Sequence, residues 1–193
     1  MSEFTCLLGG SALSDFRKRK LQRRIAAATG FDGSIDAHHV YLVESGAGLD
    51  AVGIAALENL LQGRHVEGLD EDGLLLVVPR IGTLSPWSTK ATDIAQHCGL
   101  DTVLRIERGT AFYLPGLPGS AAAGAADVLH DRMTQSVMAR LDDAFGLFAH
   151  NEPRPLLSVP VLERGRDALE IANRELGLAI SPDEMDYLVE AFT

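Results

Sequence analysis

The apolar run Leu74–Val78 constrains the fold of this chain more than any other stretch of its sequence. Five hydrophobic residues follow Gly73 without a polar break, a pattern typical of an inner strand that is covered on both faces. A polar stretch follows at once, and helical spacing of small and apolar residues then predicts a helix over Ser88–Cys98, which Gly99 ends. The chain must therefore bury one strand completely and pack the next helix against its sheet.

Predicted strands and helices alternate through the rest of the N-terminal part. Residues Ile35–Val43 show the two-residue period of a strand with one buried face. Ser14 is placed to begin a helix, which Gly30 ends. The other expected elements are strands at Phe4–Leu8, Thr102–Arg108 and Ala111–Leu114, helices at Asp50–Gln62 and Ala126–Phe145, and a mobile loop at 115–126.

This order of elements predicts an α+β fold, in which an antiparallel or mixed sheet is layered on one side by helices. A ferredoxin-like arrangement is the first choice. Residues 4–44 and 74–114 both read strand–helix–strand, which makes them candidate halves of a doubled unit. The two stretches share no side-chain signature, so chance similarity is the alternative.

A domain boundary is expected near residues 150–160, where three prolines would interrupt a continuous helix. We therefore predict an N-terminal α+β domain at 1–150 and a small helical segment at 151–193. Residues 162–193 carry three basic and eight acidic side chains, and Ser181–Glu184 has the pattern of a capping box. An apolar stripe runs to the last residue, and we expect the chain to be the front part of a longer one.

Composition excludes several classes of protein. A net charge of −10 makes nucleic-acid binding an unfavourable function, since it needs clustered positive potential. Cys6 and Cys98 have no disulfide or metal-ligand spacing, so both are expected to be reduced core residues. No stretch has the length of a membrane-spanning helix or of a secretion signal. We expect a cytoplasmic protein without membrane or nucleic-acid partners.

The polar stretch between the buried strand and the next helix concentrates the candidate chemistry. Ser85, Ser88, Thr89 and Lys90 stand at a helix N-terminus, whose free N–H groups and partial positive charge could hold a phosphate or carboxylate. Plain capping by Ser85 or Ser88 explains the same residues without a ligand. Trp87 suits either an interface or the core. Phosphate-loop and nucleophile-elbow motifs are absent.

Other charged residues carry weaker indications. The basic run at 17–24 is either a solvated helix face or a steering surface. His38 and His39 are neighbours in a strand, so they point to opposite faces and cannot bind one metal together. Asp93 and Glu107 show no spacing that identifies an acid–base pair, and their roles stay open.

Several long strings carry a resemblance to a known family. They are Arg80-x-Gly82-Thr83-x-Ser85-Pro86-Trp87-Ser88-x-Lys90-Ala91-Thr92-Asp93-Ile94, Ile106–Gly109, His130–Thr134, Ala172–Leu178 and Asp183–Leu188. Together they resemble the N-terminal domain and the start of the linker of the large single-chain phosphoribosylformylglycinamidine synthase, the FGAR amidotransferase of purine biosynthesis. The resemblance covers essentially the whole chain.

The resemblance implies an ATP-dependent ligase that converts FGAR to its amidine with ammonia from glutamine. Its synthetase and glutaminase domains, with the ATP, Mg²⁺ and glutamine sites, would lie beyond Thr193, so no catalytic residue, metal or cofactor is expected in this chain, and the chain alone is expected to be inactive. The N-terminal domain is similar to a dimer of the small accessory subunit of split enzymes. Its implied role is to dock on the synthetase domain and help ammonia transfer. The residues expected at the domain interface or close to the substrate are Arg80, Thr83, Ser85, Trp87, Ser88, Lys90, Thr92 and Asp93.

A free-standing regulatory or metabolite-binding module is the alternative. In that case residues 85–90 would hold a phosphorylated ligand.

Overall fold

The computed structural model describes residues 2–149 and 155–192. The chain divides into two compact units, Met1–Asn151 and Glu152–Thr193.

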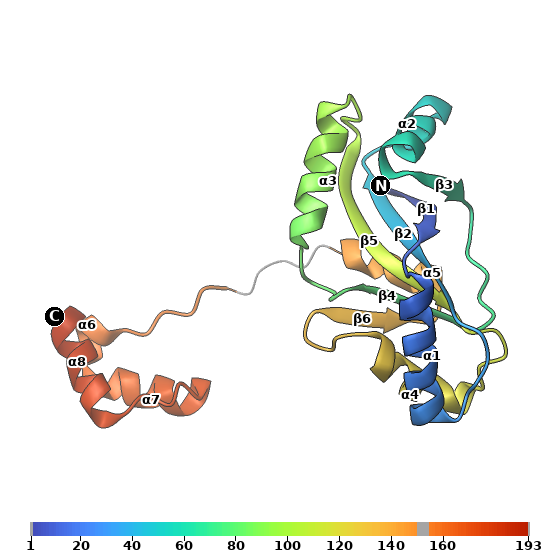
Figure 1. Ribbon diagram of the computed structural model, residues 1–193. Coiled ribbons are helices and arrows are strands. Elements are labelled where there is room, and N and C mark those ends of the chain that lie inside the picture. The colour runs from blue at the N-terminus through green and yellow to red at the C-terminus, as the bar shows by residue number, and fades with distance from the viewer. Residues whose placement is uncertain (1, 150–154, 193) are drawn as a thin grey trace. The chain divides into compact units, whose positions relative to one another are not determined.

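An antiparallel sheet forms the centre of the first unit (Figure 1). Within residues 2–149 it has six strands, in the order β3-β1-β2-β5-β4-β6. The strands are β1 (Glu3–Ser11), β2 (Asp36–Ser45), β3 (Gly63–Val66), β4 (Leu74–Pro79), β5 (Val103–Tyr113) and β6 (Gln135–Met138). The predicted α+β class is confirmed, and every strand pair is antiparallel.

The order of elements repeats once within this unit. Strands β1 to β3 enclose helices α1 (Asp15–Thr29) and α2 (Ala51–Leu61), and strands β4 to β6 enclose α3 (Pro86–His97) and α4 (Gly119–Leu129). The sheet order is symmetric about the central pair β2–β5, because each half contributes its second, first and third strand outward from that pair.

Helices begin at side-chain caps that the sequence indicates. Ser14 Oγ accepts from the Arg17 N–H, and Asp50 Oδ1 accepts from the Gly53 N–H at 2.8 Å. Gly30 ends α1 in the left-handed conformation, with φ of 76°. These local bonds fix the helix ends, so the predicted positions of α1 and α2 agree with the structure within one residue.

Two apolar clusters hold α1 to α4 against one face of the sheet. Leu57 and Leu61 of α2 and Ala95 of α3 pack on the end of the sheet that carries Val43 and Ile106. A second cluster at the other end joins one buried residue from each of α1 and α4 to strand residues: Ile25, Ala125, Ala37, Leu75, Val77 and Phe112. The two helix pairs therefore cover different ends of the same face, as Figure 1 shows.

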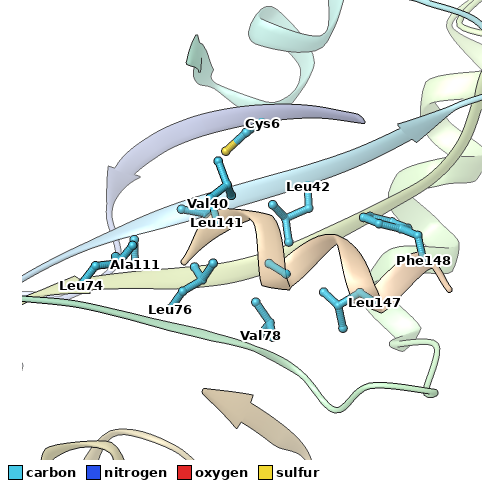
Figure 2. Packing of buried hydrophobic residues seen from close by; sticks show 11 residues of the cluster. Cys6, Val40, Leu42, Leu74, Leu76, Val78, Ala111, Leu141, Leu147 and Phe148 are labelled. Carbon is cyan, nitrogen blue, oxygen red and sulfur yellow. The ribbon is translucent and has the colours of Figure 1, made fainter. Parts of the chain in front are cut away.

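The opposite face packs on a short helical segment, α5 (Leu141–Ala144) and the 3-10 helix η1 (Phe145–Phe148). Figure 2 shows the strand side chains that point toward this segment, among them Val40, Leu42 and Leu76. The sheet thus has helices on both faces, whereas the sequence predicted a layer on one side. Burial of β4 on both faces is confirmed, because its residues Leu74–Val78 are all buried.

Four predicted elements after residue 100 differ from the structure. The two strands expected at 102–108 and 111–114 are one strand, β5, which continues through Gly109. A Cβ at Gly109 would lie 2.8 Å from the Val77 carbonyl, so this glycine allows β4 and β5 to approach closely instead of ending a strand. The expected loop at 115–126 contains most of α4, whose interior is rich in alanine.

The long helix expected at 126–145 is also wrong. Its apolar spacing is real, but α4 ends at Leu129, and Gln135–Met138 then pair with β4 as strand β6. The sequence analysis missed β6 and β3, which are four-residue edge strands without a clear two-residue alternation. Cys98 is exposed rather than part of the core, whereas Cys6 is buried as predicted.

The second unit is a small group of helices, α6 (Val161–Arg164), α7 (Arg166–Leu176) and α8 (Pro182–Phe192). The predicted capping box is confirmed: the Ser181 N–H donates to Glu184 Oε2 at 2.8 Å, and the Glu184 N–H donates to Ser181 Oγ at 3.4 Å. Few of the described residues of this second unit are buried, namely Ala168, Leu169, Ala172 and Met185.

Candidate functional site

The polar stretch between β4 and α3 folds into a tight corner, which together with the first two turns of α3 spans residues 80–93. Gly82 adopts a φ of 81°, and Thr83 Oγ1 donates to the Arg80 carbonyl at 2.6 Å. Ser85 then caps α3, because its Oγ accepts the Ser88 N–H at 3.0 Å, and Pro86 occupies the first turn. The capping interpretation of this stretch is therefore realised by Ser85.

Glu107, a fully buried carboxylate on β5, holds the corner from beneath. It accepts the Ser85 hydroxyl at Oε2 over 2.9 Å and the Arg105 Nη2 at Oε1 over 2.7 Å. Arg105 also donates to the Thr83 carbonyl at 2.8 Å and to the Leu147 carbonyl at 2.9 Å. The ion pair thus ties the corner to η1 on the other face of the sheet, which fixes the N-terminus of α3.

Helix α3 covers an edge that the sheet leaves open. Strand β4 pairs with β5 only as far as Val77 opposite Thr110, so the backbone of β5 before Thr110 lacks a strand on that side. Two α3 side chains take its place: Thr92 Oγ1 accepts the Ile106 N–H at 2.9 Å, and Gln96 Nε2 donates to the Val103 carbonyl at 2.8 Å. Buried backbone groups need such partners.

Aromatic rings connect the corner to the face of the sheet. The Trp87 ring stacks on Tyr41 at 5.9 Å between centroids with an interplanar angle of 23°, and the Arg108 guanidinium lies 4.9 Å from the Trp87 centroid. A Cβ at Gly9 would lie 2.9 Å from the Tyr41 ring, so glycine on β1 leaves the room that this ring needs. Trp87 is half-buried and serves both packing and surface.

A polar groove lies on the sheet between the two helix pairs. At one end of β2 and β5, the residues beside this groove pack under α1 and α4. At the other end they pack under α2 and α3. The groove encloses about 290 Å³, and its polar lining residues are His39, Ser85, Arg108, Thr110, Thr134 and Gln135.

His39 has an unusual environment in this groove. Its Nδ1 is buried and has no hydrogen-bond partner among the described residues. An unmet bond of this kind costs about 1–3 kcal/mol. Burial lowers the pKa of the imidazole below its ordinary 6.5, and the nearby Arg108 charge lowers it further. The ring is therefore neutral at pH 7.

The structure divides the eight predicted contact residues into two groups. One group makes the bonds that hold the corner and α3 in place: the side chains of Thr83, Ser85 and Thr92, and the backbone N–H of Ser88, whose buried hydroxyl has no partner among the described residues. The other group lies wholly or partly at the surface: Arg80, Trp87, Lys90 and Asp93. Ser88 is fully buried, and Lys90 has no ion pair with any residue in the described ranges. The interface role of all eight stays a prediction.

Sequence reasoning missed the residues beneath and beside the corner. Glu107 and Arg108 lie in the string Ile106–Gly109 that supports the family resemblance, but nothing in the sequence indicated their roles or those of Arg105 and Tyr41, which depend on strand register. One signal was present: Arg105–Arg108 places three charged residues within a strand that must be largely buried. Charges in such a strand need partners.

Residues 2–149 and 155–192 contain neither a metal-binding cluster nor a membrane-spanning helix. No cluster of three or more side chains of metal-binding type comes together there. Likewise, no helix in these ranges has the length and hydropathy to cross a membrane.

A family model described as formylglycinamide ribonucleotide amidotransferase N-terminal matches residues 38–148. The match begins in β2 and ends at the last residue of η1. It therefore contains the corner, the Glu107 ion pair, the aromatic stack and the groove.

Proposed function

The chain belongs to the formylglycinamide ribonucleotide amidotransferase N-terminal family, as the sequence resemblance predicted, and from this premise we propose that it is a non-catalytic assembly domain. The family is the N-terminal part of an ATP-dependent ligase of purine biosynthesis that takes ammonia from glutamine. In our proposal the domain docks on the synthetase domain of the same polypeptide through the corner at residues 80–93 and helps ammonia reach the substrate.

The observation that carries the docking proposal is that hydrogen bonds hold the backbone of the corner on its core side, while its outer side is exposed to solvent. Glu107 and Arg105 fix its backbone from the core side. On the outer side Ile81 is 48% exposed and Leu84 is 59% exposed, and Lys90 in the first turns of α3 is exposed as well. Apolar side chains on a preorganised backbone bind a partner without a large ordering cost.

A second hollow extends this surface along α3. It is lined by Leu84, Thr92, Asp93, Leu104 and Arg105 with their neighbours, and it encloses about 580 Å³. Leu104 is 52% exposed at its rim. Two of the predicted contact residues, Thr92 and Asp93, thus line a depression that an apolar side chain of another domain could fill.

The proposal assigns no catalysis to this chain. Its best candidates for acid–base chemistry are already occupied: the Glu107 carboxylate binds Arg105 and Ser85, and the Asp93 carboxylate is 3.4 Å from His97. ATP, Mg²⁺ and glutamine are assigned to the synthetase and glutaminase domains of the parent enzyme.

The alternative function, a phosphorylated ligand at residues 85–90, is less favourable. A phosphate there would lie beside the Glu107 carboxylate, which is 2.9 Å from Ser85 Oγ. Like charges in a partly buried site repel strongly. The Ser85 hydroxyl is also used twice, as cap and as donor to Glu107.

We further propose that the first unit is an internal duplication that resembles a dimer of the small accessory subunit of split enzymes. The repeated order of elements and the symmetric order of strands about β2–β5 support this proposal. Residues 151–193 would begin the linker to the synthetase domain.

The docking proposal is tested by producing the chain and the remaining polypeptide of the parent amidotransferase separately. We expect a stable complex in sedimentation experiments and amidotransferase activity only when both parts are present. Leu84→Glu should abolish the complex, because it places a charge in the proposed interface. Arg64→Gln, an exposed substitution on β3, is the matched control. Association of the Leu84→Glu variant with unchanged affinity would refute the docking surface.

Activity of the chain alone separates the proposal from its alternative. We expect no ATP hydrolysis and no release of ammonia from glutamine by the purified chain. Calorimetry with FGAR, ATP and inorganic phosphate should show no binding that depends on Lys90. Tight binding that Lys90→Gln removes would favour the metabolite-binding module.

A further inference from the structure

We propose that the groove between the two helix pairs is an anion-binding site, which takes a phosphate or carboxylate group against Arg108 and His39. This site is distinct from the corner at residues 80–93, although Ser85 lies at the border of both. It does not depend on the docking function, because every residue that builds it is present in this chain.

Arg108 supplies a positive charge that is held in place but not neutralised. Its guanidinium lies 4.9 Å from the centroid of the Trp87 ring, and it forms no ion pair with any residue in the described parts of the chain. In the β2–β5 register Arg108 is directly opposite Tyr41, whose ring supports Trp87. A stacked guanidinium keeps its fork of N–H donors free for an oxyanion.

His39 supplies a second polar group beside this charge. It is opposite Thr110 in the same strand pair, two residues from Tyr41, and it lines the groove together with Arg108. The neutral imidazole has one N–H donor, and Nδ1 lacks a partner among the described residues. A bound oxyanion gives both groups a partner that the chain itself does not provide.

The lining of the groove favours an anion at Arg108 and His39 rather than at Ser85, because the Ser85 hydroxyl already donates to the buried Glu107 carboxylate at 2.9 Å. The chain has a net charge of −10, yet the residues that line the groove include no Asp or Glu. Thr110 and Gln135 add a hydroxyl and an amide group that can donate hydrogen bonds, whereas the Thr134 hydroxyl already donates to Asp131 Oδ2 at 3.2 Å. The volume of about 290 Å³ exceeds that of a single phosphate, so a larger group can carry the anion.

The test uses the chain as it is, with inorganic phosphate and N-acetylglutamate as two probes and sodium chloride at equal ionic strength as reference. Trp87 is the only tryptophan, and its ring lies 4.9 Å from the Arg108 guanidinium, so its fluorescence reports on a change at Arg108. The side-chain resonances of His39 in NMR spectra give a second, independent measure of binding. We expect saturable changes of both signals with at least one probe.

Two variants make the test specific. Arg108→Gln should weaken binding at least about tenfold, which corresponds to the loss of ~1.4 kcal/mol, and Arg108→Lys should restore part of the affinity because it keeps the charge. Arg64→Gln, on the other face of the sheet, should bind as the parent chain does. If Arg108→Gln folds poorly, the affinity of the His39→Gln variant for the two probes tests the site instead.

The relative response to the probes identifies the source of the anion. A stronger response to phosphate indicates a small phosphorylated ligand, and a stronger response to N-acetylglutamate indicates an acidic side chain. The inference is overturned if neither probe gives a saturable response, or if Arg108→Gln and His39→Gln bind as tightly as Arg64→Gln. Either result leaves the docking proposal at residues 80–93 untouched.

Discussion

Replacing Glu107 by alanine should destabilise the first unit more than any surface substitution. The carboxylate is fully buried and accepts bonds from Arg105 at 2.7 Å and from Ser85 at 2.9 Å. Its removal leaves the largely buried guanidinium of Arg105 without its counter-charge, since only 20% of that side chain is exposed. Breaking a buried ion pair from one side costs about 3–5 kcal/mol.

We expect Glu107→Ala to lower the free energy of unfolding by that amount. For a unit of this size each kcal/mol shifts the melting temperature by about 2–4 °C, so the midpoint should fall by about 6–20 °C. Urea denaturation followed by Trp87 fluorescence measures the effect in the first unit alone, because the second unit has no tryptophan. Glu107→Gln should lose less, since it keeps the volume and can still pair with Ser85.

The matched control is Glu67→Ala, an exposed acidic residue outside the sheet. It should change the free energy of unfolding by no more than about 0.5 kcal/mol. The reasoning about the corner is refuted if Glu107→Ala is no more destabilising than Glu67→Ala. In that case the buried ion pair would not be what fixes the N-terminus of α3.

Three further predictions concern other parts of the first unit. Burial raises the pKa of the Cys6 thiol to about 12, so iodoacetamide at pH 8 should label the native chain once, at the exposed Cys98. Cys6 should be labelled only in denaturant, and two labels without denaturant would contradict this prediction. The hydrogen bond from Lys18 lowers the pKa of Asp36 below 3.8, and this contribution to stability is complete above pH 3.8 and is lost as the pH falls through the lowered value. Asp36→Asn should therefore cost up to about 1 kcal/mol at pH 7 and progressively less as the pH falls below 3.8, and a cost that does not change with pH would show that the bond is not the cause. Gly109→Ala should destabilise the β4–β5 pair by about 1–3 kcal/mol in urea denaturation, because its Cβ would lie 2.8 Å from the Val77 carbonyl, while Gly10→Ala, which meets no atom within 4 Å, should be neutral within about 0.5 kcal/mol.

The sequence by itself determined the features that depend on near neighbours. Ser14, Asp50 and Ser85 cap their helices through bonds to N–H groups three residues away, and the Ser181–Glu184 capping box spans the same short distance. The apolar run of β4 was equally readable, because complete burial leaves no polar position in a strand. Long strings of residues were also enough to identify the family.

Only the tertiary structure decided the contacts that carry the proposals. Ser85 and Glu107 are 22 residues apart in sequence, and Arg105 and Leu147 are 42 apart, so no local pattern relates them. Edge strands such as β6 are also not recognisable from local sequence, because pairing with the neighbouring strand stabilises them more than their own residues do. Strand register places Arg108 opposite Tyr41, and the gap between two helix pairs leaves this part of the sheet open. Local sequence sets the ends of elements, whereas packing between distant elements sets which charges are buried and which stay free to bind.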